Sequence, residues 1–351
     1  MESQLMTALS CCATLRARNW RFGLLLAIGV LAMSPVRAGA DELTDALKQV
    51  PTRIVYETWQ DDNWELFTVR ADGSELTNLT KTPDANELYP HVSADGRKIA
   101  FVCDEGTGAT KVRNVYVMNL DGTERQRVAT NSRQPCWQEG SAILSYLKGE
   151  VEKFTFTDYA TKGVFMYDLA SGQHTQHPNK QLMHLYNPCW TPDGKWCVAT
   201  VHAGMGFSHA ILAFKVDGMQ VFDLKIPGCR PDISPDGKRI TWGASDWALR
   251  VGDLDFSGDA PKVLNARDVA TSEKPMKIYH SDWSPCGKFI AFSRGPDKEI
   301  LGTIPEVVGA KAQGWNIGVA DAGQANRWTM ITTDGKCNKE PDWIPPVKET
   351  P

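Results

Sequence analysis

Several familiar signatures are absent from the 351-residue sequence, and each absence removes a class of protein. No Cys-x-x-Cys pair occurs, so a zinc ribbon or a thioredoxin-like redox centre is not indicated. No Gly-x-Ser-x-Gly motif occurs, which excludes the nucleophile elbow of the serine hydrolases. Positive charge is not in excess either, since 38 lysines and arginines face 42 acidic residues. Because a nucleic-acid partner requires a basic face, we expect none.

A long hydrophobic run is also missing. The apolar segment 22–33 has about twelve residues, whereas a membrane-spanning helix needs roughly twenty. Arg16, Arg18 and Arg21 precede this segment, and an Ala-Gly-Ala cleavage site that ends at Ala40 follows it. This order predicts a signal peptide, and hence a periplasmic or secreted protein that is not an integral membrane protein after cleavage. An uncleaved N-terminal anchor is the alternative.

Removal of the leader changes the charge and the cysteine count. The leader carries four arginines against one glutamate, so the rest of the chain has a net charge near −7. Seven cysteines remain, namely Cys103, Cys136, Cys189, Cys197, Cys229, Cys286 and Cys337. Because an odd number cannot all pair in an oxidising compartment, at least one thiol is expected to be free or ligating.

A repeated segment is the most informative feature that the sequence does have. Clear copies occupy 89–101, 187–195, 230–240 and 281–292, a degraded copy lies at 134–137, and a half copy at 340–343. In the clear copies a proline, replaced by Ser281 in the last of them, opens a short strand, an apolar residue packs one face, and a Pro-Asp-Gly-like turn leads to a returning strand. Two further strands follow, so each unit has four antiparallel strands, which is the size of a propeller blade.

The two ends of the chain complement one another. The first unit begins at 53 without an opening strand, and the half copy at 340–343 is an opening strand without the other three. We therefore expect an all-β, six-bladed propeller closed by the C-terminal strand, because closure removes two open sheet edges. Two stacked β-sandwiches would leave the half copies unexplained. The expected division is a signal peptide at 1–40, a short linker at 41–51, the propeller at 52–346 and a tail at 347–351.

The repeat resembles that of the TolB C-terminal propeller, the WD40-like or PD40 repeat. The resemblance covers about 52–346 and implies a TolB-like six-bladed propeller. The resemblance to TolB is limited to the propeller. In TolB an α/β domain precedes the propeller, and this chain is expected to lack that domain. Related propellers also precede the peptidase domain of the dipeptidyl-peptidase IV and prolyl oligopeptidase families. The repeat residues belong to the scaffold and do not themselves define a function.

Long loops are expected on one face only. The turns after the first and third strands of each unit are tight, whereas the insertions at 148–163, 178–186, 266–279 and 296–313 all fall on the opposite side. Long loops on a rigid scaffold commonly carry binding residues. Four tryptophans at the repeat position, Trp137, Trp190, Trp283 and Trp343, are expected in the core between blades, whereas Trp59, Trp247 and Trp315 lie near the loops.

The residue after the repeat proline is expected near the same face, around the channel. Reading round the ring gives Asp342, His91, Cys136, Cys189, Asp232 and Asp282. Three interpretations stay open. In the first, the aspartates cap backbone N–H groups and the cysteines are small buried residues. In the second, the six residues bind a metal. In the third, Cys136 and Cys189 form a disulfide.

Several histidines suggest an alternative function, namely catalysis. His184, His202, His209 and His280 fall on or near the loop face, and the sequence around His280 is similar to the repeats of propeller-type oligogalacturonate lyases. That similarity implies a metal-dependent polysaccharide lyase or hydrolase, with His91, His184, His280 and Asp282 as candidate ligands of a divalent ion.

The expectation favoured by the sequence is a non-catalytic module that binds a protein or a cell-envelope polysaccharide on the long-loop face, without a cofactor. The candidate binding residues are His91, His202, Asp232, His280, Asp282, Arg294 and Asp342.

Overall fold

The computed structural model describes residues 35–138, 142–299 and 302–347, so the expected leader lies almost wholly outside the described residues. The first described element is the helix α1 (Pro35–Lys48). Leu43 and Leu47 lie one helical turn apart and are buried against Ile54, Tyr56 and Phe67. The expected linker at 41–51 is therefore wrong, since most of it is a helix docked on the propeller. Within the described ranges, no helix is long and apolar enough to cross a membrane.

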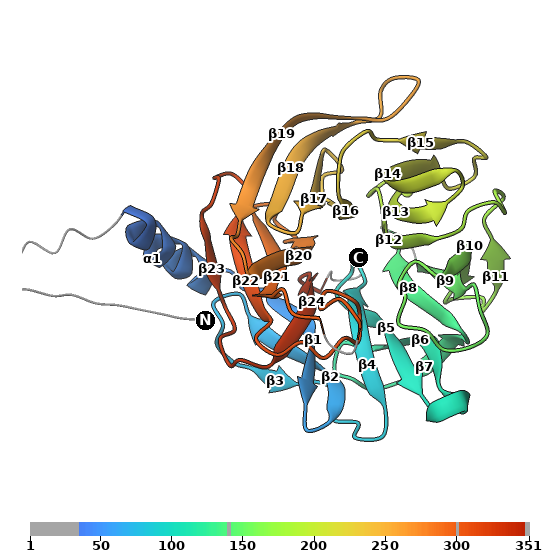
Figure 1. Cartoon of the computed structure of the whole chain (residues 1–351), viewed down its shortest axis with the longest axis horizontal. Helices are drawn as coiled ribbons and strands as arrows, with labels where there is room; N and C mark the ends of the chain where they lie inside the picture. Colours follow the sequence, from blue (N-terminus) through green and yellow to red (C-terminus); the bar gives the residue numbers. More distant parts are fainter. Residues whose placement is uncertain (1–34, 139–141, 300–301, 348–351) are drawn as a thin grey trace, which may run out of the picture. The chain divides into compact units, whose positions relative to one another are not determined.

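Six four-stranded antiparallel sheets form a ring (Figure 1). Blade 1 contains β24 (Cys337–Ile344), β1 (Arg53–Gln60), β2 (Asn63–Arg70) and β3 (Thr77–Asn78). Blade 2 contains β4 (Asn86–Val92), β5 (Lys98–Glu105), β6 (Val112–Asn119) and β7 (Gln126–Ala129), with a 3₁₀ turn at Gly108–Thr110. Blade 3 contains β8 (Ser132–Trp137), β9 (Ile143–Gly149), β10 (Thr161–Asp168) and β11 (His174–Gln176).

The second half of the ring has the same organisation. Blade 4 contains β12 (Leu185–Trp190), β13 (Trp196–Gly204), β14 (Phe207–Lys215) and β15 (Val221–Asp223). Blade 5 contains β16 (Cys229–Ile233), β17 (Arg239–Ser245), β18 (Ala248–Asp255) and β19 (Lys262–Thr271). Blade 6 contains β20 (Met276–Trp283), β21 (Phe289–Pro296), β22 (Asn316–Asp321) and β23 (Trp328–Met330). The segment 266–279 was expected to be a long loop, but it belongs mostly to β19 and β20, because β18 continues to pair with β19 as far as Thr271.

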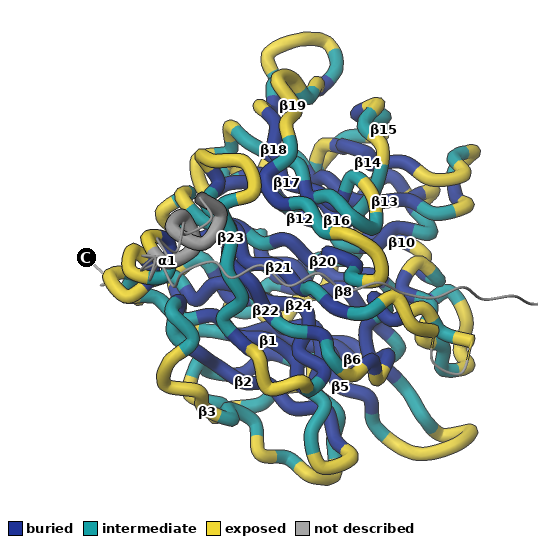
Figure 2. Tube along the Cα trace, turned by 60° about the vertical axis from the view of Figure 1, so that its left-hand side comes forward, coloured by how far each residue is buried: buried dark blue, intermediate teal, exposed yellow. Residues whose placement is uncertain are grey.

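The C-terminal strand closes the ring as predicted. β24 pairs antiparallel with β1, so that Trp343 lies opposite Ile54. The six-bladed propeller is thereby confirmed, and the alternative of two sandwiches is wrong. Exposed chain is concentrated in loops and outer turns, whereas the strands are largely buried (Figure 2). The four repeat tryptophans are all 5% exposed or less, in agreement with a role in the core.

The repeat motif has a local physical basis in the tight turn. Ser93 donates its hydroxyl hydrogen to Asp95 (2.6 Å), and the same Asp95 oxygen accepts the N–H of Arg97 (3.1 Å). Gly96 follows Asp95 in the left-handed conformation, with φ of 70°. A Cβ at Gly96 would lie 2.3 Å from the Pro345 carbonyl oxygen, so the turn also needs glycine for space.

A second recurring feature lies inside the channel. Each innermost strand has a break in register next to the repeat proline position. The residue before that position is not glycine in any blade, yet its φ is positive in all six, with values from 46° to 56°. These bulges lie at equivalent positions of the six blades, so the six residues with positive φ form a ring around the channel. This ring is part of the candidate site.

Candidate functional site

The residues after the repeat proline position, which is Ser281 in blade 6, link neighbouring blades. We call them the latch ring: His91, Cys136, Cys189, Asp232, Asp282 and Asp342. The carboxylate of Asp232 accepts the backbone N–H of Trp283 (2.8 Å), one blade further on. Asp282 accepts the N–H of Trp343 in the same way (2.9 Å). The equivalent distance from Asp342 to the N–H of Val92 is 3.3 Å. These aspartates therefore satisfy buried backbone donors across blade boundaries, as the first interpretation predicts.

Cysteine plays the same part in two blades. The sulfur of Cys189 accepts the N–H of Ile233 (3.3 Å), and its thiol donates to Asp232 (3.0 Å). Cys136 interacts likewise with the backbone N–H of Trp190. Burial raises the pKa of both thiols well above the usual value. All seven cysteines in the described part of the chain are free, so a Cys136–Cys189 disulfide is not formed.

The latch ring does not lie at the long-loop face, and that expectation is wrong. Its residues line a hollow of about 380 Å³ together with the turn prolines Pro192, Pro235 and Pro285. The physical reason is the direction of the innermost strand, which ends at the tight turn immediately after this ring. His91, Asp232, Asp282 and Asp342 therefore surround the channel on the tight-turn side. Burial lowers the pKa of His91 to about 4, and its Nδ1 lies 3.8 Å from Asp342.

The four candidate metal ligands are not brought together. His184 is bound to Glu150 (3.0 Å) and to the Ala203 carbonyl oxygen (2.7 Å), away from His91 and Asp282. His280 belongs to a separate buried network. Among the residues that the structure describes, no group of three or more His, Cys, Asp or Glu side chains could hold a metal ion.

The residues before the repeat proline position form a second ring, which we call the bulge ring: Tyr89, Gln134, Asn187, Arg230, His280 and Glu340. Their φ values are unusual for residues with a Cβ, and such strain is concentrated at functional sites. Members of this ring bind one another, since Asn187 donates its side-chain N–H to the Tyr89 hydroxyl (2.9 Å) and its backbone N–H to Gln134 (2.8 Å). Sequence reasoning missed this ring except for His280. The available signal was a polar residue that differs from copy to copy beside residues that repeat.

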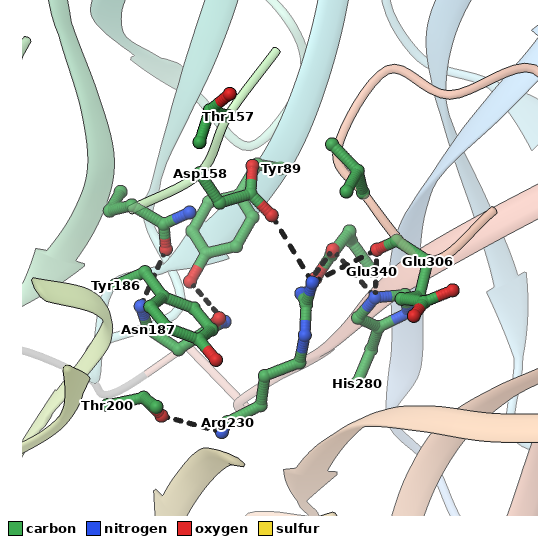
Figure 3. A network of polar contacts seen from close by, with 12 residues as sticks. Tyr89, Thr157, Asp158, Tyr186, Asn187, Thr200, Arg230, His280, Glu306 and Glu340 are labelled. Carbon is green, nitrogen blue, oxygen red and sulfur yellow. Dashed lines mark hydrogen bonds and ion pairs between the residues drawn. The ribbon is translucent and has the colours of Figure 1, made fainter. Parts of the chain in front are cut away.

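Arg230 is the centre of a buried polar network (Figure 3). Its guanidinium donates to Asp158 (3.2 Å), to Glu340 (3.3 Å) and to the Glu306 carbonyl oxygen (3.1 Å). Asp158 lies in the loop between β9 and β10, and Glu306 in the loop between β21 and β22. The two carboxylates raise the pKa of Arg230 above its usual value despite its burial. One side chain thus joins loops from blades 3 and 6, which stand on opposite sides of the ring.

His280 and Glu340 complete this network. The Nε2 atom of His280 lies 2.9 Å from the Glu306 carbonyl oxygen and 3.0 Å from a carboxylate oxygen of Glu340. Burial lowers the pKa of His280 well below its usual value, so the imidazole is neutral. The Glu306 carbonyl oxygen can only accept, so Nε2 carries the hydrogen and Nδ1 is left as a buried acceptor without a hydrogen-bond partner. Burial raises the pKa of Glu340 to about 8, although the cations Arg230 and Lys339 oppose this shift.

Two further buried cations hold the loops by their carbonyl groups. Arg133 donates to the Thr157 carbonyl oxygen (2.7 Å) in the loop of blade 3. Lys339 donates to the Val307 carbonyl oxygen (2.7 Å) in the loop of blade 6. Since Arg133 and Lys339 both precede the bulge ring by one residue, the innermost strands themselves set the position of both loops.

A pocket of about 760 Å³ opens at this long-loop face. The loop segments 154–159 and 302–307 supply two of its walls. Tyr159 packs on His202 with 4.2 Å between ring centroids, and the hydroxyl of Tyr186 lies 3.0 Å from His209. The remaining lining residues are Cys229, Arg230 and Tyr279. The pocket is therefore walled by aromatic and imidazole rings, with the Arg230 network at its base.

The remaining sequence candidates lie in different places. His202 lines the pocket, but Arg294 is bound to Ser272 (2.8 Å) and packs over Trp328. Trp315 is fully buried, so it is not a surface residue. Trp59 carries the ammonium group of Lys311 at 3.5 Å from its ring centroid. Among these candidates, His202 is therefore the one that belongs to the pocket.

Comparison with known proteins supports the fold and shows partial similarity to a peptidase. No family model matches the chain. Dipeptidyl-peptidase 5 of Porphyromonas gingivalis is 34% identical over 295 residues, which is 65% of this chain. The chain spans about 40% of the length of that relative.

Solved structures of TolB resemble the chain in fold. TolB from Acinetobacter baumannii matches with a TM-score of 0.58 and 19% identity, covering 89% of this chain and 73% of that one. The putative TolB from Agrobacterium tumefaciens matches with a TM-score of 0.54 and 14% identity, covering 83% and 92%. The chain therefore has the six-bladed β-propeller fold that is also found in TolB.

Proposed function

We propose that this propeller is an exported, non-catalytic binding module, and that a protein segment or an envelope polysaccharide occupies the pocket on its long-loop face. The observation that carries the proposal is the pocket itself. It has the volume and the largely aromatic walls of a ligand site, and it lies over a rigid scaffold. The buried Arg230 network fixes the two loops that form it, so the site is already organised without a ligand.

The charges in the network support binding over catalysis. Asp158 and Glu340 both bind Arg230, and Glu306 forms an ion pair with Lys277 (3.2 Å). His280 lies beneath these residues and is 5% exposed. A general acid or base must reach the proton that it transfers, and these groups are engaged with one another instead. The partial similarity to a dipeptidyl-peptidase favours a peptide among the ligands of the proposal.

The proposal is tested with the full chain against a glycan array and a display library of random peptides. Binding is compared between the unchanged protein and Tyr159→Ala, which removes a pocket wall. Met219→Ser is the matched control, because Met219 is 63% exposed in a turn on the other face. We expect at least a tenfold loss of affinity in Tyr159→Ala and none in Met219→Ser. Binding that is lost in Met219→Ser alone, or no binding from either collection, overturns the proposal.

A further inference from the structure

We infer that the pocket takes one large uncharged apolar side chain, aliphatic or aromatic, from a protein segment. This inference rests on the proposed function and narrows its ligand. The partner is a protein that presents such a side chain on an exposed segment, with its own backbone remaining at the mouth of the pocket. Three independent properties of the pocket lead to this chemistry.

The first property is electrical neutrality. Three charged residues line the pocket, and each already has a partner of opposite sign. Asp158 binds Arg230 at 3.2 Å, and Glu306 lies 3.2 Å from the ammonium of Lys277. Burial and the neighbouring His202 lower the pKa of His209, which favours its neutral form. A charged ligand group would leave water without gaining a counter-charge, which is strongly unfavourable.

The second property is that several polar groups of the walls already have hydrogen-bond partners within the protein. The Tyr186 hydroxyl pairs with His209, and the Tyr279 hydroxyl donates to Asp246. Thr155 donates its hydroxyl to that of Thr157 (3.0 Å). A sugar in this pocket would lose water from several hydroxyl groups, whereas among the described lining residues Asp158 Oδ1 is the one buried side-chain atom left without a hydrogen-bond partner. Because an unsatisfied buried polar group is strongly unfavourable, an apolar side chain fits these walls better than a sugar with several hydroxyl groups.

The third property is the distribution of exposed apolar side chains. Eight large apolar residues are exposed in the described part of the chain, and half of them lie on the two pocket loops. These four are Val151, Phe156, Tyr159 and Ile304, which are 36–45% exposed. Apolar and aromatic side chains gathered around a concavity are typical of a protein interface, where one anchor side chain fills a central pocket.

The experiment uses the full chain, a display library of random heptapeptides and an array of neutral oligosaccharides. Selected peptides are expected to share Phe, Trp, Leu or Met at one position. Replacing that residue by Ala is expected to weaken binding at least tenfold, and replacing it by Asp or Lys to abolish measurable binding. On the protein, Phe156→Ala and Tyr159→Ala are expected to weaken binding at least tenfold.

Leu264→Ala is the matched control, since Leu264 is 46% exposed on β19, the outermost strand of blade 5. Thermal unfolding of each variant shows that folding is retained. Selection of a charged anchor residue overturns the inference. Binding of neutral oligosaccharides alone, with loss in Tyr159→Ala, overturns the inference but leaves the proposed function standing. Binding that no pocket substitution changes overturns both.

Discussion

The latch ring and the bulge ring differ by two positions in the same strands, yet they have different tasks. The latch ring consists of aspartate, cysteine and one histidine, and its aspartates and cysteines accept backbone N–H groups of the next blade. The bulge ring contains a different polar residue in every blade, and its members bind the loops and one another. Residues that recur in the repeat therefore hold the scaffold, whereas residues that vary shape the site.

The two rings also differ in what a substitution leaves behind. Removing a latch side chain leaves one buried N–H group without a partner. Removing Arg230 leaves the Asp158 carboxylate and the Glu340 carboxyl group buried and without their shared cation. The comparison predicts a larger loss of stability from the bulge ring than from the latch ring.

The largest effect is expected from Arg230→Met. We expect the free energy of unfolding to fall by about 3–5 kcal/mol, because a buried ion network loses the cation that Asp158 and Glu340 share. Urea unfolding at neutral pH measures this change. Arg250→Met is the matched control, since Arg250 and Asp268 form an ion pair with side chains 41% and 42% exposed. Such a pair contributes about 0–1 kcal/mol. Equal effects of the two substitutions would contradict the distinction between the rings.

A smaller effect is expected from Asp282→Ala. This substitution leaves the N–H of Trp343 unpaired in the closing strand β24, so we expect a loss of about 1–3 kcal/mol. Asp282→Asn keeps an acceptor oxygen and is expected to retain most of the stability. Urea unfolding of both variants gives the difference. A loss in Asp282→Asn as large as in Asp282→Ala would show that the charge, and not the hydrogen bond, matters.

The third prediction concerns the pH dependence of stability. Because burial raises the pKa of Glu340 from 4.5 to about 8, the folded state binds its proton more tightly than the unfolded state. The resulting stabilisation is complete below about pH 4.5, falls as the pH rises, and is lost above about pH 8. One such group contributes at most about 1.4 kcal/mol per pH unit. We expect Glu340→Gln to flatten the slope of unfolding free energy between pH 6 and 8, and an unchanged slope would contradict this assignment.

Much of the fold could be predicted because its causes are local. The tight turn depends on Asp95 and Gly96, and the closure of the ring follows from complementary half copies at the two ends. The latch ring was identified from the repeat, but its side of the channel was misplaced. The order of strands determines which loops share a face. It does not determine how close a residue within a strand lies to that face, because this depends on where the strand ends.

The bulge ring could not be predicted from local rules. A residue before proline normally adopts an extended conformation, yet Tyr89, Asn187 and Arg230 have positive φ because each strand carries a bulge. The helix α1 was missed for a similar reason. Leu43 and Leu47 stabilise the helix only when they are buried against the propeller strands, and the local sequence does not show that contact. In both cases the local conformation is stabilised by contacts with segments that are distant in the sequence.

The repeat therefore determined by itself that the chain has six blades, that the C-terminal strand completes the first of them and that the tryptophans pack between them. Turn geometry and alternating burial act over a few residues, so a linear pattern is enough to specify them. Only the tertiary structure decided that Arg230 joins Asp158 and Glu306 across the channel. These residues are separated by more than seventy positions, and a buried charge is tolerated only where the folded ring brings its partners within bonding distance.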